Sequence, residues 1–190
     1  MVKAMRERIL AEALVELNLH GAEFHMDNLA RRLRISKRTL YQHFSSKQEI
    51  VQEAIISVMN DVYKQHVAML HDSSMTPEEK IMGFFAVRSR HEKLIKVFSV
   101  RKMSDVFLKM PEICNNLEAC YERDWTILDH FLDEAQQSHE FKEFDKPLLM
   151  HMLHSAAEDV LDYINEVNKD YSFQEYMNKC LAMILYGIKR

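Results

Sequence analysis

An arginine and a glutamine stand four residues apart in the segment KRTLYQH, at Arg38 and Gln42. Residues four apart share one face of an α-helix. An arginine can donate two hydrogen bonds to guanine O6 and N7, and a glutamine amide can pair in the same way with adenine N6 and N7. We therefore expect this face to read base edges in the major groove of duplex DNA.

More polar side chains surround these two. Lys37 and Thr39 are further candidates for base contacts, whereas Tyr41, His43 and Lys47 suit phosphate oxygens. Lys47 would gain from its place in the first turn of the next helix, where free amides also attract an anion. The predicted DNA-binding set is Ser36, Lys37, Arg38, Thr39, Tyr41, Gln42, His43 and Lys47.

The distribution of charge supports a polyanionic partner. The 190-residue chain has a formal net charge of -4, yet residues 1–50 hold nine Lys and Arg against six Asp and Glu. A basic head on an acidic body favours nucleic acid binding by the head alone. The alternative is that this helix face is polar only because it is solvated. The predicted neighbouring elements help to distinguish DNA binding from this alternative.

Those elements are predicted to be helices. Apolar residues at Ile9, Ala13 and Leu17 indicate a helix over about 3–19, with Gly21 as a left-handed stop and a polar face that carries Arg6, Glu12 and Glu16.

A second helix is expected over about 26–33, where Ala30 would let another helix approach closely. After a short turn, Ser36 caps a third helix that runs to Phe44 and buries Leu40 and Phe44. This order predicts a helix-turn-helix.

The rest of the chain also has helical periodicity. Only three glycines and three prolines interrupt it, so we expect an all-α protein. TPEE at residues 76–79 and SFQE at 172–175 are capping boxes, which mark helix starts. Helices are expected at about 46–70, 77–94, 97–109, 112–138, 146–168 and 173–188. The predicted domains are a DNA-binding head, residues 1–46, and a ligand-binding and dimerisation body, residues 47–190.

Other classes of chemistry find little support. Cys114, Cys120 and Cys180 are scattered, which favours neither disulfides nor a zinc finger, and we expect no cofactor and no metal. A metal between His151 and His154 would lack a local third ligand. No signal peptide or membrane span is indicated, so we expect a cytoplasmic protein without membrane contact.

The segments ILAEALVEL and HGAEFHMDNLARRLRISKRTLYQHFSSKQEIVQEAI, within about residues 6–55, resemble the TetR family of transcriptional regulators. The resemblance implies a three-helix DNA-binding head and a helical body that binds a small inducer. It also implies a homodimeric repressor on a palindromic operator, with phosphate contacts from Tyr41, His43 and Lys47.

Three residues depart from the family pattern. His25 stands where the second helix often has a Ser or Thr cap, and Arg34 replaces the turn glycine, which would strain a left-handed backbone by about 1 kcal/mol. Arg38 replaces a residue that is commonly small, so this helix has the reach to read a guanine that relatives ignore.

The body is less informative. Apolar stripes on the last two helices suit a four-helix dimer interface, although burial within one protomer is the alternative. The family places a pocket among the central helices, and the candidate ligand-binding residues are Phe85, Phe98, Met103, Phe107, Tyr121, Trp125 and His154. The rival function is a helical ligand-binding or enzymatic protein without operator binding. No nucleophile elbow, phosphate loop or HExxH motif supports an enzyme.

Overall fold

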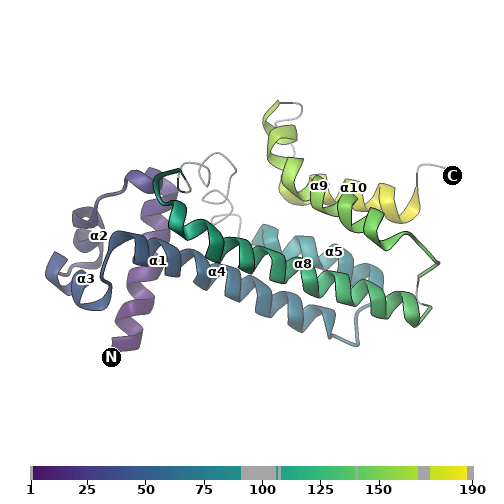
Figure 1. Cartoon of the computed structure of the whole chain (residues 1–190), viewed down its shortest axis with the longest axis horizontal. Coiled ribbons are helices and arrows are strands. Elements are labelled where there is room, and N and C mark those ends of the chain that lie inside the picture. The colour runs from purple at the N-terminus through teal and green to yellow at the C-terminus, as the bar shows by residue number, and fades with distance from the viewer. Residues whose placement is uncertain (1, 91–105, 107, 140, 167–171, 188–190) are drawn as a thin grey trace. The chain divides into compact units, whose positions relative to one another are not determined.

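The computed structural model describes residues 2–90, 106, 108–139, 141–166 and 172–187, and every regular element in these ranges is a helix (Figure 1). The all-α prediction is confirmed. The α-helices are α1 Val2–His20, α2 Met26–Leu33, α3 Lys37–His43, α4 Lys47–Leu70, α5 Pro77–Arg90, α8 Cys114–Gln137, α9 Lys146–Glu166 and α10 Phe173–Tyr186, and 3-10 turns occupy Gly21–Glu23 and Pro111–Ile113.

Most helix ends follow from local chemistry that the sequence shows. Gly21 has φ of +60° and ends α1 as expected. In the box that starts α5, the Glu79 amide donates to Thr76 Oγ1 at 3.2 Å and the Thr76 amide donates to Glu79 Oε2 at 2.8 Å. Ser172 and Glu175 form the same box at the start of α10. Most of the helix expected over 97–109 lies outside the described residues.

Packing divides the chain into two compact units. The first comprises residues 1–62 and 92–122, and the second comprises residues 63–91 and 123–190. Helices α4 and α8 each contribute residues to both units, so this division by packing differs from the functional boundary expected at residue 46.

The core of the first unit is built around the three head helices. Ile9 and Ala13 of α1, Leu29 of α2 and Leu40 of α3 are fully buried together. The start of α4 completes this cluster, and so does a segment distant in sequence, which supplies Val106, Met110, Ile113 and Leu117. That Val106, Met110, Ile113 and Leu117 share the head's core was not predicted from the sequence, because a short apolar run does not reveal its partner.

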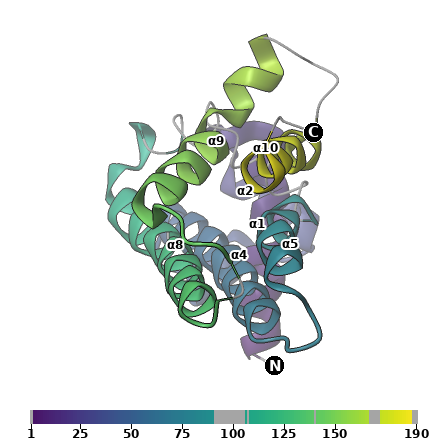
Figure 2. The same ribbon diagram turned by 90° about the vertical axis from the view of Figure 1, so that its right-hand side faces the viewer.

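The second unit has its own apolar core. Phe84 and Phe85 of α5 and Leu128 and Leu132 of α8 are buried, and α10 packs against α9 and α5 (Figure 2). Leu153, Met177 and Leu181 are buried inside this protomer as well. For these three residues of the apolar stripes of α9 and α10, the alternative of burial within one protomer therefore holds.

None of the helices in the described ranges is both long and apolar enough to span a membrane.

Candidate nucleic-acid interface

The recognition helix α3 is fixed at both ends and along one side. Ser36 Oγ accepts a hydrogen bond from the Thr39 amide at 3.0 Å, which is the predicted N-cap. Leu40 is fully buried and Phe44 is 2% exposed. Phe44 lies in extended backbone as the C-cap, so α3 ends one residue earlier than predicted.

The opposite side of α3 faces solvent with unoccupied donors. Arg38 and Gln42 are exposed, and their side chains make no hydrogen bond or ion pair with any residue that the structure describes. Tyr41 is 47% exposed beside them. Their full hydrogen-bonding capacity is therefore available to a partner, and no carboxylate of α3 competes for it.

Two of the predicted lysines are held within the head. Lys37 Nζ lies 3.1 Å from Asp27 Oδ1, although both side chains are at least half exposed. Lys47 Nζ donates to the Ala22 carbonyl and lies 4.4 Å from the ring centroid of Phe24. Burial lowers the pKa of the Lys47 ammonium, and the nearby carboxylate of Glu23 opposes this shift. A phosphate contact from either lysine would have to compete with these partners.

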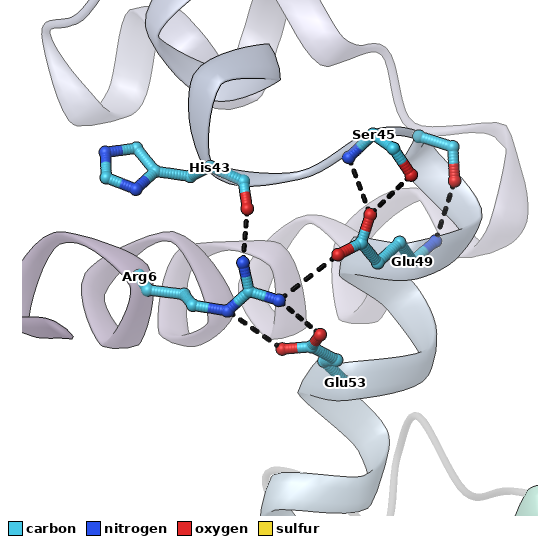
Figure 3. Close-up of polar contacts among 6 residues, drawn as sticks. Arg6, His43, Ser45, Glu49 and Glu53 are labelled. Atoms are coloured by element: carbon cyan, nitrogen blue, oxygen red, sulfur yellow. Dashed lines mark hydrogen bonds and ion pairs between the residues drawn. The ribbon is translucent and has the colours of Figure 1, made fainter. Parts of the chain in front are cut away.

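Arg6 joins α1 to the end of α3 and the start of α4 (Figure 3). Its guanidinium donates to the His43 carbonyl and to both carboxylate oxygens of Glu53, and it lies 3.2 Å from Glu49 Oε1. It also stacks over the Phe44 ring at 4.0 Å from the centroid. The carboxylate of Glu53 raises the pKa of Arg6, so the cation persists at every working pH.

Glu49 secures the loop between α3 and α4. Its Oε2 accepts from both the amide and the hydroxyl of Ser45 at 2.6 Å, and its own amide donates to Ser46 Oγ at 3.0 Å (Figure 3). The hydrogen bonds from Ser45 lower the pKa of the Glu49 carboxyl. Glu49 therefore holds the loop that follows the recognition helix in place.

This network corrects the expected polar face of α1. Arg6 points to α3 and α4, and Glu16 is only 2% exposed. Glu12 remains at the surface, where its Oε2 accepts from Arg32 Nε at 3.0 Å.

The two expected anomalies of the helix-turn-helix are present. Arg34 adopts the left-handed conformation, with φ 55° and ψ 43°, and its amide donates to the carbonyls at the end of α2. His25 is the N-cap of α2 but its side chain makes no capping hydrogen bond. The turn therefore forms without a glycine, the residue that adopts left-handed backbone without strain.

Part of the predicted ligand site gathers around Trp125. The ring centroid of Trp125 lies 6.1 Å from that of Phe85 and 4.6 Å from that of His154. Tyr121 is half-buried and belongs to the first packing unit. Phe98, Met103 and Phe107 lie outside the described residues.

A buried polar pair in the second unit escaped the sequence analysis. His66 is fully buried and stacks on Phe84 with 3.9 Å between centroids. Its Nε2 donates to the Phe84 carbonyl at 3.0 Å, and its Nδ1 lies 3.5 Å from Oδ1 of Asp124, which is 3% exposed. Only the i, i+4 spacing of His66 with apolar Val62 and Leu70 hinted that this histidine faces a core.

The described residues contain no group of three or more His, Cys, Asp or Glu side chains placed to hold a metal ion.

A capped recognition helix, packed on α2 across a short turn and followed by a helical body, defines a helix-turn-helix DNA-binding protein. Residues 9–54 match the family model described as "Bacterial regulatory proteins, tetR family".

Similarity to known proteins extends over nearly the whole chain. An uncharacterized HTH-type transcriptional regulator, YvaF of Bacillus subtilis (strain 168), is 23% identical over 188 residues, covering 97% of this chain and 95% of YvaF. The structure of the TetR family regulator PfmR from Thermus thermophilus is 25% identical, covers 96% of this chain and 100% of its own, and has a TM-score of 0.73. FadR of Bacillus subtilis, solved in complex with stearoyl-CoA, shares the fold with a TM-score of 0.70 at 18% identity, over 96% of this chain and 99% of that one. The DNA-binding head of the chain belongs to the TetR family of transcriptional regulators, the whole chain has the fold of TetR family regulators, and the protein is a DNA-binding regulator.

Proposed function

We propose that this protein is a cytoplasmic homodimeric repressor that a small-molecule ligand releases from a palindromic operator. Residues 1–46 form the DNA-binding head, and residues 47–190 form the body that dimerises and binds the ligand. The observation that carries this proposal is the outward face of α3, where Arg38 and Gln42 have no partner among the described residues.

Each side chain of this face has a role that its chemistry suits. Arg38 reads a guanine and Gln42 an adenine, with Thr39 and Lys37 beside them. Tyr41, His43 and Lys47 bind phosphate oxygens along the edges of the groove, and Ser36 aligns the first turn of α3 by capping it.

A palindromic operator has two half-sites, and a dimer can bind both at once. A two-fold dimer presents two recognition helices to successive major grooves about 34–36 Å apart, whereas a monomer presents one. The exposed apolar side chains of α9 and α10 are available for such an interface: Leu148, Met152, Met183 and Tyr186. Their exposed fractions lie between 44% and 64%, which is costly for methionine and leucine in water.

Ligand release rests on the aromatic cluster of the second unit and on the family. Phe85, Trp125 and His154 lie together and would line the site, with Phe98, Met103, Phe107 and Tyr121 as further proposed contacts. The stearoyl-CoA complex of FadR supports an organic ligand for this fold. The ligand would act by binding more tightly to a conformation that does not fit the operator.

Selection of bound sequences from a random duplex library tests operator binding. We expect the purified full chain to enrich a palindromic motif, and its affinity for that motif to fall steeply between two salt concentrations, by a slope of about -0.9 per neutralised phosphate. Tyr41→Ala should weaken binding to all sequences alike. Enrichment of no motif by dimeric protein would support the rival, a helical ligand-binding protein without operator binding.

A further inference from the structure

A cleft of about 370 Å³ lies in the DNA-binding head between α1 and α2, and none of its lining residues belongs to α3. Glu16 and His20 of α1 line one side, and Asn28, Arg31 and Arg32 of α2 line the other. Sites for small molecules commonly begin at about this size. All five lining residues are polar, so the cleft favours a small and strongly polar occupant.

One carboxylate oxygen in this cleft lacks a hydrogen-bond donor. Glu16 is only 2% exposed; its Oε1 lies 3.3 Å from Arg32 Nε, but its Oε2 accepts no hydrogen bond. His20 Nε2 lies 3.9 Å from Oε2, which exceeds hydrogen-bond distance. Buried carboxylate oxygens are normally satisfied, because an unmet acceptor away from water is costly.

The cleft also offers a cation without a partner. Arg31 is exposed, and its guanidinium forms no ion pair or hydrogen bond within the described ranges; the same is true of the side-chain amide of Asn28. Arg32 differs, because Glu12 and Glu16 engage its Nε. A free cation therefore stands near an unsatisfied buried carboxylate.

This pairing of charges restricts the class of ligand. A simple anion would be attracted to Arg31 but repelled by the buried carboxylate of Glu16. A simple cation would be repelled by Arg31 and Arg32. A molecule that carries an ammonium and a carboxylate close together can pair with both Glu16 and Arg31. Such charge-assisted hydrogen bonds are stronger than hydrogen bonds between neutral groups.

We propose that the cleft between α1 and α2 binds a free α-amino acid. Its ammonium donates to Glu16 Oε2 in place of the more distant His20 ring, which is 53% exposed and free to turn outward. Its carboxylate accepts from the Arg31 guanidinium and the Asn28 amide. The site is separate from the proposed ligand site of the body, and it gives the head a second effector that ties α1 to α2.

The test is a titration of the isotope-labelled full chain with each of the twenty L-amino acids, followed by the backbone amide resonances of residues 12–33. We expect at least one amino acid to shift these amides saturably, with a dissociation constant of about 1 mM or below. For each binder, the matched amine without the carboxylate and the matched acid without the ammonium are titrated in parallel; for leucine these are 3-methylbutylamine and 4-methylpentanoate. Each should bind at least about tenfold more weakly, because it loses one charge-assisted contact.

Two charge-removing variants locate the binding. Arg31→Gln and Glu16→Gln should each weaken amino acid binding about tenfold or more, whereas Arg8→Gln, an exposed cation of α1 outside the cleft, should not change it. Arg31 holds no intramolecular contact among the described residues, so its variant remains informative if Glu16→Gln does not fold. The proposal is overturned if no amino acid shifts the amides of residues 12–33, if an acid or an amine alone binds as tightly as the amino acid, or if Arg31→Gln binds unchanged.

Discussion

The carboxylate of Asp124 faces His66 in the core of the second unit, where both side chains are almost completely buried. A carbonyl can only accept, so His66 Nε2, which bonds the Phe84 carbonyl, carries a hydrogen. Attraction between Nδ1 and Asp124 then needs one further proton, on the ring or on the carboxylate. Removal of either Asp124 or His66 therefore leaves the other side chain buried without this contact.

We expect Asp124→Ala to lower the free energy of unfolding by about 3 kcal/mol, because it leaves His66 Nδ1 buried without a partner. Asp124→Asn should retain most of the stability, since its amide can donate to Nδ1. Urea denaturation measures both. The matched control is Asp133→Ala on the same helix, whose ion pair with Lys146 is at the surface and should contribute less than about 1 kcal/mol. A loss as small as the control's for Asp124→Ala would contradict the assignment.

Glu49 gives the head a defined sensitivity to acid. Hydrogen bonds from Ser45 hold the pKa of its carboxyl below the ordinary value of 4.5. A depressed folded pKa stabilises the protein above the unfolded value, and this stability is lost as the pH falls from about 4.5 through the folded pKa. Between about pH 6 and pH 3, the melting temperature of the wild type should therefore fall more steeply than that of Glu49→Gln. Parallel curves for the two proteins would show that these hydrogen bonds do not contribute.

The orientation of α3 depends on residues that lie outside its outward face. Arg6 ties the last carbonyl of α3 to two carboxylates of α4, so its removal loosens the recognition helix. Arg6→Met, which keeps the stacking on Phe44, should weaken operator binding about tenfold through positioning alone.

The salt dependence separates positioning from contact. Because Arg6 neutralises no phosphate in this account, Arg6→Met should leave the slope of log affinity against log salt unchanged. A flatter slope would identify Arg6 as a phosphate contact and contradict the positioning role.

The turn of the helix-turn-helix carries measurable strain at Arg34. Left-handed backbone costs a residue with a Cβ about 1–2 kcal/mol, and the greater freedom of unfolded glycine offsets about 0.4–1 kcal/mol. Arg34→Gly should therefore be more stable than Arg34→Ala by about 0.5–1 kcal/mol in chemical denaturation. Equal stability of the two variants would mean that the turn relaxes to accommodate a side chain.

The sequence predicted these elements well where the cause is local. Ser36, the boxes at Thr76 and Ser172, and the stop at Gly21 are interactions within a few residues, so their patterns are visible in the sequence. The Arg6 network, the burial of Glu16 and the packing of Met110, Ile113 and Leu117 into the head's core join segments that are far apart in the sequence. No local pattern encodes such partners. Exposure of Arg38 and Gln42 was inferred correctly because the buried positions of Leu40 and Phe44 fix the opposite face.

Binding to a palindromic operator by two recognition helices requires two copies of the chain. Met183 and Tyr186 are exposed on α10, whereas Met177 and Leu181 are buried within the protomer. The double variant Met183→Asp, Tyr186→Asp should place charges in the proposed interface and yield a monomer in light scattering coupled to size-exclusion chromatography. A matched double variant on the exposed face of α8, Thr126→Asp with His130→Asp, should leave the mass unchanged. A dimer of full affinity in the α10 variant would exclude this surface as the interface.

Base reading by α3 is measured by the motif that the wild type, Arg38→Ala and Gln42→Ala each select, in parallel, from a random duplex library. We predict that the wild type selects a palindrome, that Arg38→Ala relaxes one guanine in each half-site, and that Gln42→Ala relaxes one adenine, each at a cost of about 1–3 kcal/mol for that base. An unchanged motif in both variants would show that the outward face of α3 does not read the operator, and would contradict the account.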